Sequence, residues 1–137
     1  MLSLAVNNAI NNLSGNDKGF FLMVEGSLID KACHDLNQND VILEVIDFDK
    51  AVGEVLKFAE KDKNTLVIVT ADHETSGVSI PNGDFETGMV EMNFAGDFHT
   101  GVPVPIFAYG PGAEEFTGFY ENTDVFNKMI RAFGFTE

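Results

Sequence analysis

Residues 65–77 read TLVIVTADHETSG, and this stretch decides the fold class. Its first part, 65–69, is a short and almost continuous apolar run, which is typical of a strand buried on both faces of a sheet. Two carboxylates and an imidazole follow as Asp72, His73 and Glu74. Because functional groups gather beyond the carboxyl ends of strands in open α/β sheets, this order predicts a strand with a site at its end.

The segments around this stretch alternate between strand and helix patterns. Apolar runs at 20–24 (FFLMV) and 102–110 (VPVPIFAYG) predict two more strands. Apolar residues at helical spacing predict helices over 2–13, from 41 to about 60, and from Asn122 or Thr123 onward, where either side chain could cap. The glycine-rich residues 77–101 predict an excursion, with a hairpin as its simplest form. This alternation predicts an α/β fold with a mostly parallel central sheet flanked by helices.

Length and composition predict one globular domain over residues 1–137, with 45% hydrophobic residues and 13 Phe available for a core. The 22 acidic and 8 basic residues give a formal charge of −14, which excludes a nucleic-acid-binding or anionic-membrane surface. Cys33 is the only cysteine, so no intrachain disulfide can form. We expect neither a signal peptide nor a membrane span in this sequence.

The three histidines of the chain all fall in predicted loops beside strands, each within a few residues of an aspartate. The pairs are Asp30 with His34, Asp72 with His73, and Asp97 with His99. Imidazole nitrogen and carboxylate oxygen suit a borderline cation such as zinc, and two such groups could hold two ions. The pattern therefore predicts a metal site at one sheet edge, and it excludes a thiolate site because the single cysteine stands alone.

Simpler explanations exist for the separate pieces of this pattern. An Asp-His pair at a strand end can be a cap and a surface residue, and Asp30 with His34 could be a helical i, i+4 pair worth a few tenths of a kcal/mol. The residues from Asp35 onward (DLNQND) resemble a calcium loop, but Asp40 and Ile46 occupy its glycine and closing glutamate positions. A nucleophilic Cys33 lacks an assured base, so a small buried apolar role is the better interpretation.

Three blocks of the sequence resemble the late signature blocks of alkaline phosphatases. They are GFFLMVEGSLIDKACH at 19–34, NTLVIVTADHETSG at 64–77 and HTGVPVPIFAYGPG at 99–112, in the family's order. The resemblance covers nearly the whole chain and implies part of a large α/β sandwich. In that family a serine attacks the phosphorus of a phosphate monoester to form a phosphoserine, while two zinc ions stabilise the attacking and leaving oxygens.

Carried over position by position, the resemblance implies two zinc sites and one magnesium site. The implied ligands are Asp30, His34 and His99 for the first zinc ion, Asp72 and His73 for the second, and Glu25 for magnesium. Lys31 matches a position that in some members is lysine and helps to hold phosphate through water. Glu74 matches no ligand, and we interpret it as a hydrogen-bonded loop acid.

The sequence also departs from the family pattern. In an earlier half of its chain, the family places a nucleophilic serine directly after an aspartate, an aspartate that bridges zinc and magnesium, and an arginine that clamps phosphate. None of the five serines here follows an aspartate, and the only arginine, Arg131, lies in the predicted terminal helix. We therefore expect the carboxyl-terminal part of an alkaline phosphatase, weak or inactive alone. The implied partners are phosphate monoesters, the missing amino-terminal half and further copies of the chain, which would associate through uncovered apolar surface. The resemblance implies a periplasmic or secreted parent protein.

Two other classes stay open at this point. One is a different member of the wider superfamily, such as a phosphodiesterase or a sulfatase, whose nucleophile would lie in the missing half. The other is a non-enzymatic metal-binding or structural α/β module, in which the Asp and His residues are caps. Zinc binding separates the structural module from the enzymes, and the upstream sequence separates the enzymes from one another.

Overall fold

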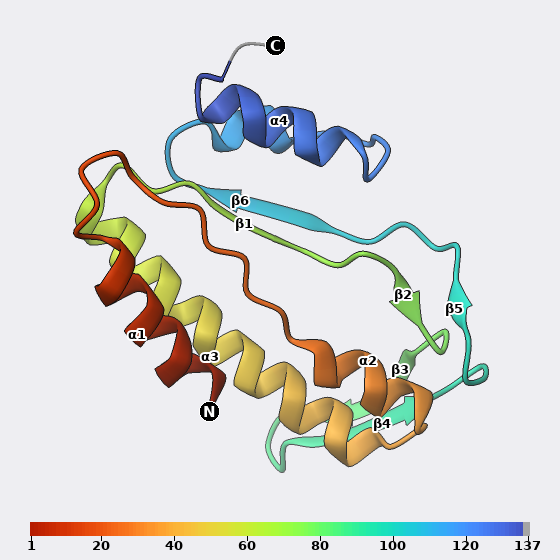
Figure 1. Cartoon of the computed structure of the whole chain (residues 1–137). Coiled ribbons are helices and arrows are strands. Elements are labelled where there is room, and N and C mark those ends of the chain that lie inside the picture. The colour runs from red at the N-terminus through yellow and green to blue at the C-terminus, as the bar shows by residue number, and fades with distance from the viewer. Residues whose placement is uncertain (136–137) are drawn as a thin grey trace. The chain divides into compact units, whose positions relative to one another are not determined.

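The computed structural model describes residues 1–135, which form two compact units. The first unit comprises Met1–Glu54 and His73–Pro103, and the second comprises Val55–Asp72 and the chain from Val104 onward. The described chain contains both helices and short strands, as predicted for an α/β protein, but they do not alternate: three helices come first, six strands follow, and a 3₁₀ helix and a last helix come after them (Figure 1). The prediction of one domain over 1–137 stays a prediction, and its last two residues lie outside the described part.

Two of the predicted helices are confirmed in the first unit. Helix α1 spans Leu2–Leu13, and its buried residues Val6 and Ile10 lie one turn apart on one face. Helix α3 spans Gln38–Asp62, so it begins before the predicted start at 41 and runs on into the second unit. Asn7 on α1 donates a hydrogen bond of 3.2 Å to Glu54 on α3, which ties the two helices together.

The strand predicted at 20–24 is wrong, because this segment belongs to no helix or strand. Phe21 and Met23 are 61% and 76% exposed, and the residues between them and on either side are half-buried. A continuous apolar run indicates burial but supplies no ladder partner, so it cannot by itself establish a strand. The segment leads instead into α2, Ser27–His34. Gly26 precedes α2 where a Cβ would lie 2.8 Å from the Phe48 ring, so glycine permits that close approach.

The described residues form three two-stranded sheets, all antiparallel. In the first unit β2 (Glu74–Thr75) pairs with β5 (His99–Thr100), and β3 (Ser79–Asp84) pairs with β4 (Met89–Asn93). In the second unit β1 (Val67–Thr70) pairs with β6 (Ile106–Tyr109). The mostly parallel sheet is therefore not confirmed. A parallel pair needs a crossover, usually a helix, but the chain between β1 and β6 makes the predicted excursion with its β3–β4 hairpin.

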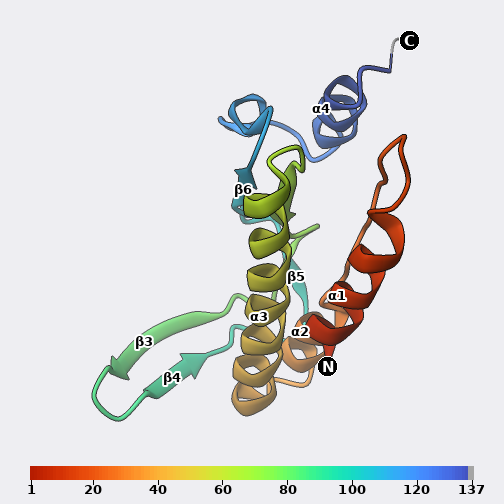
Figure 2. The same cartoon turned by 90° about the vertical axis from the view of Figure 1, so that its left-hand side faces the viewer.

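A small apolar core of the first unit packs around α2. Ala32, Cys33 and Val41 are buried there, and the half-buried Val78, Met92 and Phe94 pack against them. The hairpin is also tied to the start of α3, because Gln38 donates to the Val90 carbonyl at 2.9 Å and accepts from the Met92 amide at 2.7 Å. The far end of the hairpin extends away as a two-stranded arm (Figure 2).

The second unit is organised around the β1–β6 pair. Gly110 follows β6 with φ +103°, and a Cβ there would lie 2.2 Å from the Thr65 carbonyl oxygen, so only glycine fits. The chain continues through the 3₁₀ helix η1 (Ala113–Phe116) to α4 (Asp124–Ala132). Of the two predicted starting residues, Thr123 is the N-cap of α4, but its side chain does not make the expected capping hydrogen bond. Within the described residues, no helix combines the length and apolar character needed to cross a membrane.

Candidate metal centre

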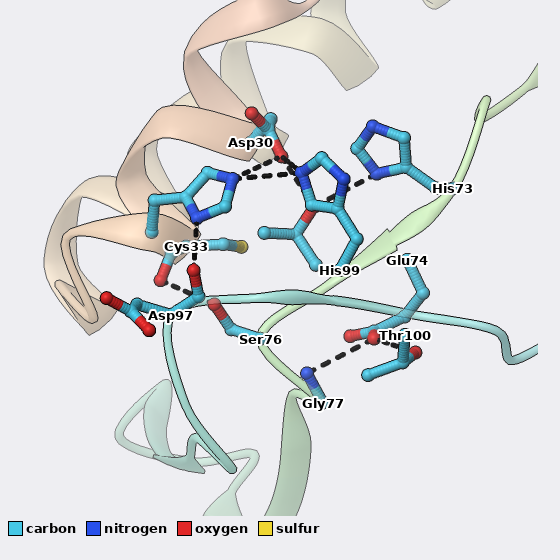
Figure 3. A network of polar contacts seen from close by, with 11 residues as sticks. Asp30, Cys33, His73, Glu74, Ser76, Gly77, Asp97, His99 and Thr100 are labelled. Carbon is cyan, nitrogen blue, oxygen red and sulfur yellow. Dashed lines mark hydrogen bonds and ion pairs between the residues drawn. The ribbon is translucent and has the colours of Figure 1, made fainter.

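Two elements of the first unit bring the candidate ligands together (Figure 3). Asp30 and His34 are four residues apart on α2, so they lie on one face of that helix. His99 opens β5 opposite Thr75 of β2, and His73 directly precedes β2. The short β2–β5 pair therefore carries two histidines to the helix face that carries the aspartate and the third histidine.

Asp30, His34 and His99 form a compact triangle of ligand atoms. The Nε2 atoms of His34 and His99 are 2.9 Å apart. Asp30 Oδ1 lies 3.4 Å from Nε2 of His99 and 3.5 Å from Nε2 of His34. Ligand atoms about 2.0–2.1 Å from one tetrahedral zinc ion are separated by about 3.3 Å, so these three atoms fit a single ion of that kind.

His73 lies against the same triangle. Its ring stacks on His99 with the ring centroids 3.6 Å apart. Asp30, His73 and His99 also offer ligand atoms that all lie within 4.8 Å of one another. The structure thus brings all three histidines and Asp30 together, as the sequence pattern predicted. His73 lies closer to the Asp30 triangle than it would if the two predicted zinc sites were far apart.

The ring orientation of His34 is fixed by the backbone of Asp97. A carbonyl oxygen can only accept, so Nδ1–H of His34 donates to the Asp97 carbonyl at 2.7 Å. In neutral imidazole this leaves Nε2 with its lone pair facing Asp30 and His99, which is the form that binds a metal ion. The sequence paired Asp97 with His99, whereas the structure uses the Asp97 backbone to orient His34.

Asp30 is held by a side chain that sequence reasoning missed. The Thr75 hydroxyl donates to Asp30 Oδ1 at 2.5 Å. This hydrogen bond, together with the neighbouring imidazoles, outweighs partial burial and lowers the pKa of Asp30. Asp30 is therefore a carboxylate near neutral pH, as a metal ligand must be. The only signal in the sequence that could have suggested Thr75 was its position directly after residues 72–74 (DHE).

Glu74 is a hydrogen-bonded acid, as predicted, but it opens strand β2 and does not lie in a loop. Its carboxylate accepts from the amides of Gly77 and Val78 at 3.1 and 3.0 Å, and from the Thr100 hydroxyl. The Thr100 hydrogen bond is the main cause of the lowered pKa of Glu74, and the two amides add to it. Since Glu74 follows His73 and Thr100 follows His99, this contact holds together the two segments that carry those histidines.

The other three candidates have exposed side chains. Asp72 is exposed and belongs to the second unit, while Glu25 and Lys31 are exposed side chains of the first unit. Their ligand and phosphate-binding roles stay predictions. Cys33 is buried, and burial raises the pKa of its thiol, with the charges of Asp30 and Glu74 adding to the shift. A neutral buried thiol agrees with the rejection of Cys33 as a nucleophile.

Comparisons with known proteins point to one family. The alkaline phosphatase family model matches residues 1–95 and 90–135. An alkaline phosphatase from Escherichia fergusonii is 39% identical, over 97% of this chain and 32% of its own length. The structure of the alkaline phosphatase from the Antarctic bacterium TAB5 matches with a TM-score of 0.92 and 41% identity, over 100% of this chain and 42% of that one. A variant of the TAB5 enzyme with magnesium bound in its M3 site matches with a TM-score of 0.91, with the same identity and coverage.

The chain spans about a third of the length of the alkaline phosphatases from Escherichia and Pseudomonas aeruginosa that it matches. Over that third the match is nearly continuous, and it includes the three sequence blocks that supply the candidate ligands. The predicted α/β fold is confirmed as that of the corresponding part of a solved phosphatase. On sequence and fold together, this chain belongs to the alkaline phosphatase family.

Proposed function

We propose that this chain is the carboxyl-terminal, metal-binding part of an enzyme that hydrolyses phosphate monoesters with two zinc ions and a phosphoserine intermediate. The observation that carries the proposal is the triangle of Asp30, His34 and His99, whose ligand atoms lie 2.9 to 3.5 Å apart. Neutral imidazoles beside an ionised carboxylate form a donor set that suits zinc. These three residues would hold the first ion.

The remaining metal assignments complete this proposal. Asp72 and His73 would contribute to the second zinc site, and Glu25 to a magnesium site. A neighbouring phosphatase structure with magnesium in its M3 site supports including that metal. Lys31 would help to hold phosphate through water. When bound, the zinc ions supply positive charge that stabilises the attacking and leaving oxygens of an in-line displacement.

The residues of this chain would organise the site and leave the attack on phosphorus to another part of the parent enzyme. The Asp97 carbonyl orients His34, and Thr75 orients Asp30. No serine in the sequence follows an aspartate, and Arg131 is the only arginine. Substrate binding therefore depends on bound metal and on the amino-terminal half of the parent, because the chain itself carries a formal charge of −14.

Zinc binding by the 137-residue chain tests the proposed metal role. Titration calorimetry of the wild type should show one tighter site, because only the first site has its three protein ligands in this chain. His34→Ala should abolish that site, since it removes a ligand atom from the triangle. Asp49→Asn, a change of one exposed acid on α3, is the matched control and should bind like the wild type. Two equally tight sites, or none at micromolar zinc, would contradict this assignment.

Turnover measurements test the proposal that this chain holds metal ions while another part of the parent enzyme attacks phosphorus. With zinc and magnesium present, the chain should hydrolyse a generic phosphate monoester very slowly or not at all, because metals alone do not replace the nucleophile and the phosphate clamp. Rapid, zinc-dependent turnover by this chain would refute that expectation. The parent enzyme, with its amino-terminal half, is the positive control, and we place it in the periplasm or outside the cell, like a typical bacterial phosphatase of this family.

A further inference from the structure

The hydroxyl of Thr75 lies between two candidate metal ligands. Thr75 is only 8% exposed, and its Oγ1 is 2.5 Å from Asp30 Oδ1 and 3.3 Å from Nδ1 of His73. One buried side chain thus touches a residue of the Asp30 triangle and the histidine outside it.

The number of available protons fixes the direction of both contacts. A hydroxyl has one proton to donate, and an ionised carboxylate can only accept. The short contact between Thr75 and Asp30 therefore uses the proton of Thr75. The oxygen of Thr75 can then act only as an acceptor toward His73, so Nδ1 of His73 must carry a proton. In a neutral imidazole that leaves the lone pair on Nε2.

This proton placement also decides where His73 can bind a metal ion. Nδ1 faces Thr75, and the lone pairs of the two nitrogens of an imidazole ring point in different directions. The lone pair of Nε2 therefore points away from the hydroxyl that holds Asp30. One ion shared by Asp30, His73 and His99 is the competing arrangement, since their ligand atoms lie within 4.8 Å. If that ion used Nδ1, His73 would have to lose the proton that Thr75 accepts.

We propose that Thr75 is a positioning residue that orders Asp30 and keeps His73 in the Nδ1–H tautomer, so that His73 serves an ion other than the one held by the Asp30 triangle. The inference rests on the proposed function for the identity of the metal. The tautomer itself is a property of the metal-free chain. The hydroxyl of Thr75 therefore separates His73 from the triangle of three ligands that contains Asp30.

Nitrogen NMR of the histidine rings tests the tautomer directly. The metal-free chain is labelled with ¹⁵N and measured above the ordinary titration range of imidazole, about pH 6.5. His73 in the wild type should carry its proton on Nδ1, and Thr75→Val should remove that preference because valine has the same shape but no hydroxyl. Thr75→Ser should restore it. Thr123→Val is the control, since the Thr123 side chain makes no capping hydrogen bond.

A wild-type His73 protonated on Nε2, or a Thr75→Val spectrum identical to the wild type, would overturn the proposal. Matching backbone amide spectra of the valine and serine variants show that each has folded. If valine at this position prevents folding, the wild-type tautomer and the serine variant still decide the question, because neither measurement depends on the valine variant.

Zinc affinity tests the separation into two groups. Thr75→Val should weaken the tighter site by roughly 10–100-fold, as is typical when a hydrogen-bond partner of a metal ligand is lost, and Thr75→Ser should bind like the wild type. His73→Ala should leave the tighter site unchanged, whereas a loss of about tenfold or more would reveal a shared ion and overturn the separation. Absence of zinc binding in the wild type would refute the metal assignment, while the tautomer measurement would still decide the role of Thr75.

Discussion

The β2–β5 pair and the β3–β4 hairpin of the first unit are stabilised by different kinds of contact. The β2–β5 pair has only two residues in each strand, yet Thr75 within β2 and Ser76 directly after it are 8% and 0% exposed. The β3–β4 hairpin has strands of six and five residues, but every residue of β3 is exposed, and Phe85 at its turn is fully exposed. The longer ladder is the less buried of the two.

The short pair is held by side chains that cross to other segments. Ser76 donates to the Cys33 carbonyl on α2 at 2.7 Å, Thr75 donates to Asp30, and Glu74 binds Thr100. Gln38 holds only the near part of the hairpin, at Val90 and Met92, whereas the turn end depends on the backbone ladder and on Asp84, which accepts from the backbone of its own turn. Satisfied polar contacts in a buried setting fix side-chain positions more tightly than ladder length does, which is what a metal site requires.

Alanine substitution of one left-handed glycine in each region should give the largest difference in the free energy of unfolding between the β2–β5 pair and the hairpin. Gly77 has φ +57°, and a Cβ there would lie 2.8 Å from the Cβ of Ala95, whereas Gly88 in the hairpin has φ +72° and open space around it. Gly77→Ala should lower the free energy of unfolding by about 2–3 kcal/mol, from backbone strain plus overpacking. Gly88→Ala should cost about 1 kcal/mol, from strain alone. Urea unfolding measures both, and equal losses would show that the Ala95 contact is not restrictive.

The sequence supported the parts of this structure that depend on local pattern. The spacing of apolar residues located α1 and most of α3, and the i, i+4 spacing of Asp30 and His34 placed them correctly on one helix face once α2 formed. The clustering of histidines near aspartates also predicted which residues would meet. These features are set by period and by chain neighbours, so a single sequence contains them.

The features that the sequence did not predict depend on partners distant along the chain. The run at 20–24 has the composition of a strand but belongs to no helix or strand. Strand β6 returns antiparallel to β1, because the chain between them makes no helical crossover. The contact of Thr75 with Asp30 joins residues 45 positions apart. Nothing in the residue type of Thr75 distinguishes it from an exposed strand threonine, so only the tertiary structure reveals its role.

Removing the charge of Glu74 should have the next largest effect. Because the folded-state pKa of Glu74 is lowered from its ordinary value of 4.5, its contribution to stability is present above about pH 4.5 and is lost as the pH falls through the folded-state pKa. Glu74→Gln should therefore lower the free energy of unfolding by about 1 kcal/mol at pH 7, and the difference from wild type should shrink toward pH 3. Urea unfolding over that pH range measures it.

Asp84→Asn in the hairpin is the matched control for this acid. Hydrogen bonds from its turn, chiefly that of the Thr87 amide, lower the pKa of Asp84, but the side chain is exposed and an asparagine oxygen can still accept from the same amides. Its effect at pH 7 should be the smaller of the two. A larger loss for Asp84→Asn than for Glu74→Gln would show that the turn, rather than the histidine-bearing pair, depends more on its charge.

Serine at the hairpin tip should have the smallest effect on stability and a separate effect on association. Phe85 is fully exposed, so Phe85→Ser should change the free energy of unfolding by less than about 0.5 kcal/mol. We propose that the chain self-associates through exposed apolar surface, which on this arm also includes Ile80 and Met89, at 62% and 45% exposure. Light scattering at high concentration should therefore show oligomers of the wild type and fewer of Phe85→Ser. A monomeric wild type would refute this association. If Phe85→Ser forms the same oligomers as the wild type, the chain associates through another surface. An unchanged free energy of unfolding in Phe85→Ser would show, in either case, that the β3–β4 arm contributes little to the stability of the first unit. We expect the β2–β5 pair next to the histidines to contribute more.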